Sequence, residues 1–308
     1  MPLFQTAFRA LGGPAEIQVG APDEPTARAW FRGAIDEIDR IEIKYSRYRE
    51  NSLISRINAA AGGHPVAIDE ETSALLDVAD ALFHQSAGRF DLSSGVWRRL
   101  WNFRDPQAPL PTPDQRSALS PLVGWPLVER TPTHVRLPRA GMELDLGGIG
   151  KEYAVDRCAV KLMEAGAQHA LVNLAGDMRA VGGKPDGGPW QVGIQHPEHP
   201  DAVMAELPLQ DGALATSGDY ARCIWRNGKR YGHLLDARSG WPVQHWRSIS
   251  VRAPSAVWAG GLSTVAMLME AQGLGLLQQA GVDFLAVDAK GEIHTRAGTH
   301  LPKTKPGP

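Results

Sequence analysis

The sequence predicts an α+β protein, and three features of the chain carry this prediction. Residues 23–45 place apolar side chains at spacings of three and four, as a helix with one buried face does: Phe31, Ile35, Ile38, Ile41 and Tyr45. From Met142 onward, short strand-like and helical patterns alternate. Asn227-Gly228 lies between two short extended segments and favours a tight hairpin turn. Helices and paired strands are therefore both expected.

The first half of the chain reads as a strand over 16–19 followed by the helix over 23–45. Ser52 can cap a short helix carrying Leu53, Ile54 and Ile57, and Asp69 can cap another whose inward positions are Leu75, Val78 and Leu82. Residues 105–138 contain eight prolines, which predicts a loop and an internal boundary. We expect one domain over 1–300, made of two interwoven lobes, and a disordered tail over 301–308.

The second half predicts a strand over 142–146, a glycine turn over 147–150 and a helix from Lys151. A strand over 170–174, a tight turn over 175–177 and a strand over 190–194 follow. After the hairpin at 222–233, we expect a strand over 248–251, a helix over 256–270, and a closing hairpin that joins 284–287 to 292–294.

Composition excludes several classes of protein. The 32 basic and 34 acidic residues give a net charge of −2, which argues against a globally basic nucleic-acid binder. Two cysteines, Cys158 and Cys223, are too few for a disulfide framework or a structural zinc site. We find no signal peptide and no apolar run long enough to span a membrane, so we expect a cytoplasmic protein.

The first candidate site is the segment from Asp145 to Tyr153. A strand delivers a carboxylate, glycines turn the chain, and a helix begins with Lys151 in its first turn, where free backbone N–H groups attract phosphate. An ordinary strand-to-helix turn would look the same. The segment is no P-loop, because Asp145 and Glu152 stand where that motif needs Gly and Ser or Thr, and it lacks the Rossmann glycine spacing.

The second candidate site joins 216–220 to 233–240 on either side of the predicted hairpin. It gathers hydroxyls, carboxylates and an imidazole, and His233 is suited to act as a general base. A histidine that only hydrogen-bonds a neighbouring turn is the alternative.

Two further segments are less specific. Adjacent Gly260 and Gly261 inside a helix cost about 1 kcal/mol each relative to Ala, which indicates close approach to the helix backbone by another group or by a packed neighbour. The Tyr and Arg residues of 45–58 could pack on an aromatic ring or form a solvated helix face.

Taken in order, these segments resemble the ApbE family of FAD:protein FMN transferases. The resemblance runs from about Leu11 to Met269. Its motifs are Tyr45-Ser-Arg-Tyr48, Phe90-Asp91-Leu-Ser-Ser-Gly95, Asp145-Leu-Gly-Gly-Ile-Gly-Lys151, Ala170-Leu-Val-Asn-Leu-Ala-Gly-Asp177, Pro189-Trp190-Gln-Val-Gly-Ile194, Thr216-Ser-Gly-Asp-Tyr220, His233-Leu-Leu-Asp236 and Ser263-Thr264. Each motif alone is weak, whereas the ordered series is specific.

The resemblance implies an ApbE-like fold, with mixed or antiparallel sheets and flanking helices around a central FAD cleft. It implies an enzyme that cleaves FAD and attaches FMN to a Thr or Ser hydroxyl of an acceptor flavoprotein, releasing AMP. FAD and the acceptor protein are the expected partners, without nucleic acid. By position, the implied flavin contacts are Leu11, Tyr48, Arg89, Phe90, Asp91, Asp145, Lys151 and Leu235, with His233 as the catalytic base.

The implied Mg²⁺ site is where this chain departs from the family. The family's ligands are a carbonyl matching Gly148, a Thr matching Thr264 and an Asp, and Gly260 stands in the place of that Asp. Mg²⁺ is normally held by at least one carboxylate, which Asp177 or Asp219 could supply through space. Two alternatives to transfer therefore stay open: an FAD-binding protein with weakened or lost chemistry, and an FAD pyrophosphatase that yields FMN and AMP.

Overall fold

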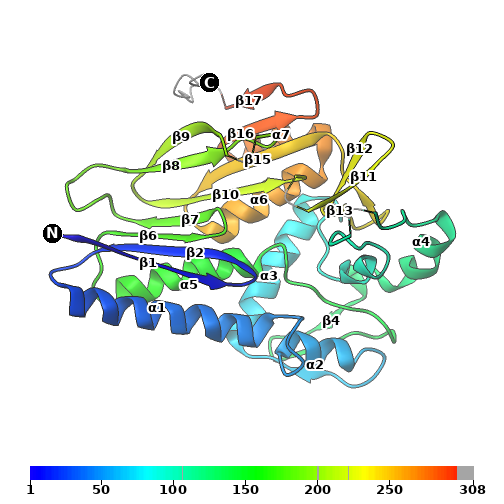
Figure 1. Ribbon diagram of the computed structural model, residues 1–308. Helices are drawn as coiled ribbons and strands as arrows, with labels where there is room; N and C mark the ends of the chain where they lie inside the picture. The colour runs from blue at the N-terminus through cyan, green and yellow to red at the C-terminus, as the bar shows by residue number, and fades with distance from the viewer. Residues whose placement is uncertain (106, 200, 221, 297–308) are drawn as a thin grey trace.

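The computed structural model describes residues 1–105, 107–199, 201–220 and 222–296, and it confirms the α+β prediction (Figure 1). Within these residues, eight strands form the central sheet in the order β1-β2-β6-β7-β10-β15-β16-β17, and all neighbouring strands are antiparallel. Their bounds are β1 Leu3–Ala10, β2 Gly13–Gly20, β6 Ala170–Leu174, β7 Asp177–Val181, β10 Gly212–Gly218, β15 Trp246–Ala253, β16 Asp283–Asp288 and β17 Ile293–Thr295.

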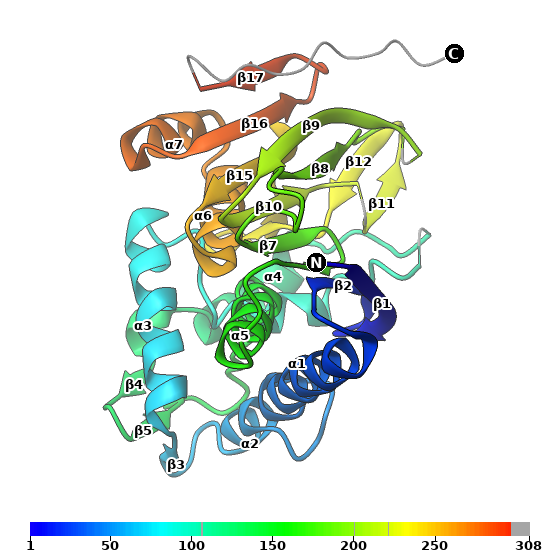
Figure 2. The same ribbon diagram turned by 90° about the vertical axis from the view of Figure 1, so that its left-hand side faces the viewer.

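Helices cover one face of this sheet (Figure 2). Helix α5 contacts β6 and β7, α6 contacts β10 and β15, and α1 packs along α5. The α-helices are α1 Glu24–Tyr45, α2 Leu53–Ala59, α3 Glu70–Gln85, α4 Pro113–Leu119, α5 Gly150–Glu164, α6 Ala256–Leu268 and α7 Gly273–Ala280. Short 3₁₀ helices span Gly95–Arg99, Ser120–Leu122, Trp125–Leu127 and Glu270–Gln272.

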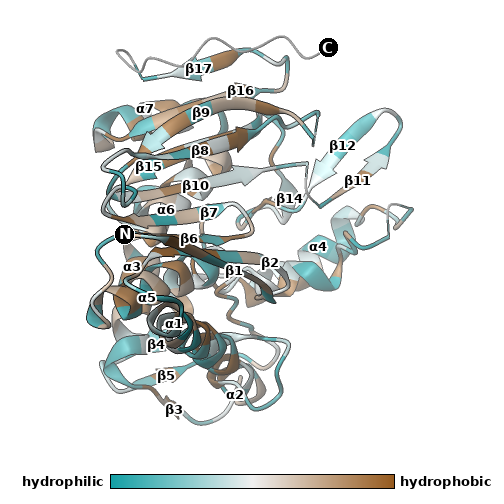
Figure 3. Cartoon of the chain, turned by 60° about the vertical axis from the view of Figure 1, so that its left-hand side comes forward, coloured by the Kyte–Doolittle hydropathy of each residue, from teal (hydrophilic) through white to brown (hydrophobic). Residues whose placement is uncertain are grey.

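A hairpin of β8 (Trp190–Gln195) and β9 (Val203–Leu209) covers the other face. Its strand β8 alternates buried and exposed residues, and the buried Trp190, Val192 and Ile194 pack on Leu171 and Leu214 of the sheet. Side chains thus enter two apolar layers from one sheet, because successive residues of a strand point to opposite faces. Hydropathy follows this layering, with apolar β6 inside and polar β12 outside (Figure 3).

Local signals placed the helix starts correctly. The side chain of Asp23 accepts a hydrogen bond from Thr26 N at 2.8 Å, Ser52 from Ser55 N at 3.0 Å, and Asp69 from Thr72 N at 3.0 Å. Each oxygen satisfies an N–H that the first helical turn would otherwise leave unpaired.

The predicted hairpin at Asn227-Gly228 is confirmed. Both residues have positive φ, 50° and 72°, as the tight turn between β11 (Cys223–Arg226) and β12 (Lys229–Gly232) requires. The closing hairpin β16–β17 is confirmed as well. Small ladders also join β13 (Leu235–Asp236) to β14 (Trp241–Pro242), and β5 (His134–Arg136) to both β3 (Val66–Ala67) and β4 (Glu129–Arg130).

Two predictions were wrong. Residues 142–146 are not a strand of a sheet, since only an isolated bridge joins Glu143 to Ser94. In place of a neighbouring strand, the Asn58 side-chain amide bonds both backbone groups of Leu144. It accepts a hydrogen bond from the Leu144 N–H at 2.7 Å and donates one to the Leu144 carbonyl at 3.0 Å. The proline-rich 105–138 region is not all loop, because Thr112 and Gln115 form a capping box that starts α4. The predicted tail over 301–308 lies outside the described residues.

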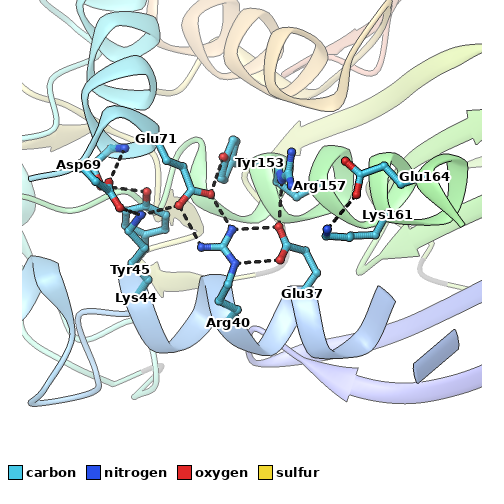
Figure 4. A network of polar contacts seen from close by, with 11 residues as sticks. Glu37, Arg40, Lys44, Tyr45, Asp69, Glu71, Tyr153, Arg157, Lys161 and Glu164 are labelled. Carbon is cyan, nitrogen blue, oxygen red and sulfur yellow. Dashed lines mark hydrogen bonds and ion pairs between the residues drawn. The ribbon is translucent and has the colours of Figure 1, made fainter. Parts of the chain in front are cut away.

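An ion-pair network fastens α5 to α1 and α3 (Figure 4). Buried Glu37 accepts hydrogen bonds from Arg40 at 2.8 Å and from Arg157 at 2.9 Å. Arg40 continues to Glu71 of α3 at 2.6 Å, and the Tyr153 hydroxyl donates to the same carboxylate at 2.7 Å. The network fixes the helix whose first turn contains Lys151. None of the helices in the described ranges has the length and apolar run that a bilayer crossing requires.

Candidate active site

An ion pair between Lys151 and Asp177 stands at the centre of the candidate site. Lys151 lies in the first turn of α5, and Asp177 begins β7 directly after a turn in which Ala175 and Gly176 have φ of 50° and 94°. Asp177 is 2% exposed. Although burial opposes the charge of Lys151, the Asp177 and Glu152 carboxylates raise the pKa of its ammonium, so Lys151 is a cation at neutral pH.

A second carboxyl, Glu152, lies beside this pair and points toward α6. Its side chain is buried, and its Oε2 atom has no hydrogen-bond partner among the described residues. Burial, reinforced by the nearby charge of Asp177, raises the pKa of Glu152 well above its ordinary value. A Cβ atom added to Gly260 would lie 2.4 Å from Glu152 Cγ. The glycine therefore makes the room that this glutamate occupies.

Hydroxyl groups from β10 and α6 complete this part of the site. Ser217 Oγ lies 2.8 Å from Ser263 Oγ and 2.9 Å from Thr264 Oγ1. Ser263 Oγ also donates to the carbonyl of Gly260 at 3.0 Å. Carboxylates, hydroxyls and carbonyls are all oxygen donors, the type that hard divalent cations bind.

The adjacent glycines of α6 are explained by packing. Glu152 fills the space over Gly260, and a Cβ on Gly261 would lie 2.8 Å from Leu82 Cδ1 of α3. Both neighbours approach the helix backbone more closely than any larger residue would allow.

The glycine turn before α5 is tied to two other predicted residues. Asp145 Oδ1 accepts a hydrogen bond from Gly147 N at 3.0 Å, and its Oδ2 pairs with Arg47 at 2.7 Å. A Cβ on Gly148 would lie 2.8 Å from Phe90 Cε2, so the turn needs glycine there. Helix α5 begins at Gly150 without a side-chain cap, and the Gly150 N–H donates to the Leu146 carbonyl at 2.7 Å.

His233 lies on the segment between β12 and β13. Burial lowers the pKa of its imidazole to about 4, and the positive charges of Arg222 and Lys151 act in the same direction. Its buried Nδ1 has no hydrogen-bond partner among the described residues. The ring is therefore neutral at physiological pH, as a proton acceptor must be.

The segment after His233 is joined to the loop before Phe90. Arg89 Nε lies 3.7 Å from Asp236 Oδ2, and Ala237 N donates to Arg89 O at 3.1 Å. Leu235 packs with the aromatic cluster around Trp101. The structure thus joins 89–90, 145–152 and 233–237, which are distant in the sequence.

Three further residues that the resemblance implies as flavin contacts are Asp91, Leu11 and Tyr48. Asp91 is buried, and its two oxygens accept from Ser93 N at 2.7 Å and Trp125 N at 2.8 Å, so its carboxylate braces a loop. Leu11 has φ of 52° and its N–H donates to Glu42 Oε2 at 2.9 Å. Tyr48 is 71% exposed, with the Arg47 guanidinium 4.9 Å from its ring centre.

Sequence reasoning included Ser217 in the second candidate site but missed Glu152 as a member of this cluster. Of the two carboxylates considered as replacements at the metal site, Asp177 lies in the cluster, but Asp219 is bound by Arg230 at 2.9 Å and Arg247 at 2.6 Å. A glutamate directly after Lys151 was a visible signal, yet nothing local linked it to Gly260.

The chain matches the ApbE family model over residues 11–286. The FAD:protein FMN transferase of Haemophilus influenzae is 34% identical over 236 residues, which cover 73% of this chain and 68% of that protein. The FAD:protein FMN transferase of Treponema pallidum is 30% identical over 279 residues, covering 83% and 76%.

Solved structures agree with these matches. The ApbE protein of Thermotoga maritima superposes with a TM-score of 0.88 at 29% identity, covering 96% of this chain and 97% of that one. The flavinyl transferase ApbE of Pseudomonas stutzeri, in its apo form, gives 0.85 at 27% identity, covering 96% and 95%. Sequence and fold together place this chain in the ApbE family.

Proposed function

We propose that this protein transfers FMN from FAD to a Thr or Ser hydroxyl of an acceptor flavoprotein and releases AMP. The Lys151 ammonium, two buried carboxyls, the uncapped start of α5 and a neutral histidine support this proposal. Relatives that carry the same transferase name support it independently.

In the proposed reaction, the acceptor oxygen attacks the phosphorus of the FMN half of FAD. The bond from that phosphorus to the bridging oxygen breaks, and AMP leaves with this oxygen. His233 accepts the hydroxyl proton, while Lys151 and the N–H groups at the start of α5 hold phosphate oxygens. Positioning and neutralisation of charge dominate phosphoryl transfer, so these groups carry much of the catalysis.

Mg²⁺ would supply further neutralisation of the pyrophosphate when bound. We propose that Thr264 Oγ1 and the carbonyl of Gly148 contribute to its site, and the oxygen-rich surroundings of Thr264 fit such an ion. Arg89, Phe90, Asp145 and Leu235 are proposed to contact the flavin nucleotide, as are Leu11 and Tyr48.

The test is incubation of the purified chain with FAD, Mg²⁺ and an acceptor protein carrying the family's target motif. Mass spectrometry should find FMN on the target hydroxyl and AMP in solution. A Thr→Ala acceptor should stay unmodified, and His233→Gln should slow transfer about 10²–10⁴-fold, the usual contribution of a general base. Free FMN with an unmodified acceptor would identify a pyrophosphatase instead, and intact FAD would identify a binding protein.

A further inference from the structure

The resemblance to the ApbE family implies a carboxylate ligand at position 260, where this chain has glycine. The space that a side chain at 260 would occupy is filled from the neighbouring helix by Glu152. An added Cβ would lie 2.4 Å from Cγ, 3.0 Å from Cδ and 3.1 Å from Oε1 of that glutamate. The Glu152 side chain therefore lies against the α6 backbone, in the space that the side chain of an aspartate at position 260 would enter.

The Glu152 carboxyl is held in place but incompletely bonded. The residue is 7% exposed, no donor of the described residues reaches its Oε2, and its carboxyl lies beside that of Asp177. An unpaired buried carboxyl oxygen is costly, so such an atom normally has a ligand. The neighbouring cation, on Lys151, is paired with Asp177.

Side chains of α6 and β10 near Gly260 offer oxygen atoms, the donor type that hard divalent cations bind. One turn of α6 separates Gly260 from Thr264, whose hydroxyl contacts Ser217 at 2.9 Å. Helices α5 and α6 lie next to each other along this stretch (Figure 2). Glu152 on α5, Asp177 on β7 and Thr264 on α6 thus belong to three elements that contact one another.

We propose that Glu152 supplies the carboxylate ligand of the divalent metal in this chain, in place of an aspartate at 260. The inference rests on the metal-assisted function proposed above and changes the origin of one ligand, from α6 to α5. The glutamate side chain is one methylene longer than aspartate, which lets it reach across from the adjacent helix. Glycine at 260 is then required, because any side chain there would displace the ligand.

The test is Mn²⁺ binding to the purified chain without FAD or acceptor, followed by the electron paramagnetic resonance signal of free Mn²⁺. Glu152→Gln keeps the volume and removes the ionisable carboxyl. It should weaken Mn²⁺ binding at least tenfold, since loss of groups that only orient metal ligands already costs about 10–100-fold. The matched control is Glu164→Gln on the same helix, an exposed residue paired with Lys161, which should bind Mn²⁺ as the unaltered chain does.

A ligand exchange gives the sharper result. Gly260→Asp alone should not strengthen Mn²⁺ binding, because the new side chain collides with Glu152. Glu152→Ala combined with Gly260→Asp should recover most of the affinity that Glu152→Ala loses. Circular dichroism would reveal whether Glu152→Gln folds. If it does not, the double variant still tests the proposal.

Three results would overturn the inference. They are unchanged Mn²⁺ affinity in folded Glu152→Gln, failure of the double variant to recover binding, and absence of Mn²⁺ binding by the unaltered chain. Because the titration contains no flavin, it is separate from the transfer assay. Transfer that proceeds normally in Glu152→Gln would leave the proposed function standing and remove Glu152 from it.

Discussion

The low proton affinity of His233 has a consequence for stability that can be measured directly. Burial and two nearby cations lower the pKa of the folded-state imidazole from 6.5 to about 4. In the unfolded chain the pKa returns to its ordinary value. Between pH 6.5 and 4, the imidazole therefore binds a proton in the unfolded state but not in the folded state. The free energy of unfolding consequently falls as the pH falls.

The size of the effect follows from the shift. Each pKa unit is worth about 1.4 kcal/mol, so the full shift corresponds to about 3 kcal/mol between pH 7 and pH 4. Because the ring is only partly removed from solvent, this figure is an upper bound. His233→Gln removes the titrating group and retains a polar side chain of similar size.

The assay is urea-induced unfolding of both proteins at several pH values between 7 and 4. Other groups titrate in the same range, but they do so in both proteins and cancel in the difference. The stability advantage of the unaltered chain over His233→Gln should shrink by about 2–3 kcal/mol as the pH falls. A constant difference across this range would refute the argument and return the imidazole pKa to near its ordinary value.

Three further predictions concern the frame of the site. Lys151→Met should weaken FAD binding about 10–100-fold in a fluorescence titration, since it removes the proposed charged contact to phosphate. Adding Asp177→Asn removes the carboxylate that Lys151→Met leaves unpaired, so it should restore stability without restoring FAD affinity; recovered FAD binding would contradict the phosphate role. Glu37→Gln should lower the free energy of unfolding by about 2 kcal/mol, because it removes the buried charge that Arg157 pairs with in the network of Figure 4. The control Arg28→Ala breaks an exposed ion pair and should change the free energy of unfolding by less than about 0.5 kcal/mol. Equal losses in the two variants would mean that the network does not stabilise the fold. Gly240→Ala should lower the free energy of unfolding by about 1–3 kcal/mol, because φ of Gly240 is 62° and the new Cβ would lie 2.7 Å from a carbon of the Trp97 indole. The measurement is thermal unfolding, and an unchanged melting temperature would show that the loop adjusts without cost.

Much of the fold could be predicted because its signals are local. The caps Ser52 and Asp69 are satisfied by N–H groups three residues away, and Asn227-Gly228 sets its own turn. Residues 142–146 have strand-like composition, but their partners are an Asn58 side chain and the Leu92 carbonyl, which no periodicity reveals. Propensity predicted an extended backbone there, and tertiary contacts decided what that backbone bonds to.

The candidate site, like the fold, could be predicted only where its signals are local. Lys151 and His233 could be singled out from the residues around them, and in the structure the charge of Lys151 acts on the His233 ring. The relation between Glu152 and Gly260 could not be predicted, because it exists only where two helices touch. Sequence comparison at position 260 alone therefore suggests a missing ligand, whereas the packing suggests an exchanged one.

The order of strands in the central sheet has a consequence for synthesis of the protein. The hairpin β1–β2 is made long before β6, yet the inner edge of β2 pairs with β6, where Ile17 faces Val172. At ribosomal speeds, that edge waits roughly 10–30 s for its partner. During this interval its backbone donors and acceptors, and the buried face of α1, remain available to other chains. Nascent-chain helpers that shield extended segments should therefore matter more for this protein than for one whose neighbouring strands are consecutive.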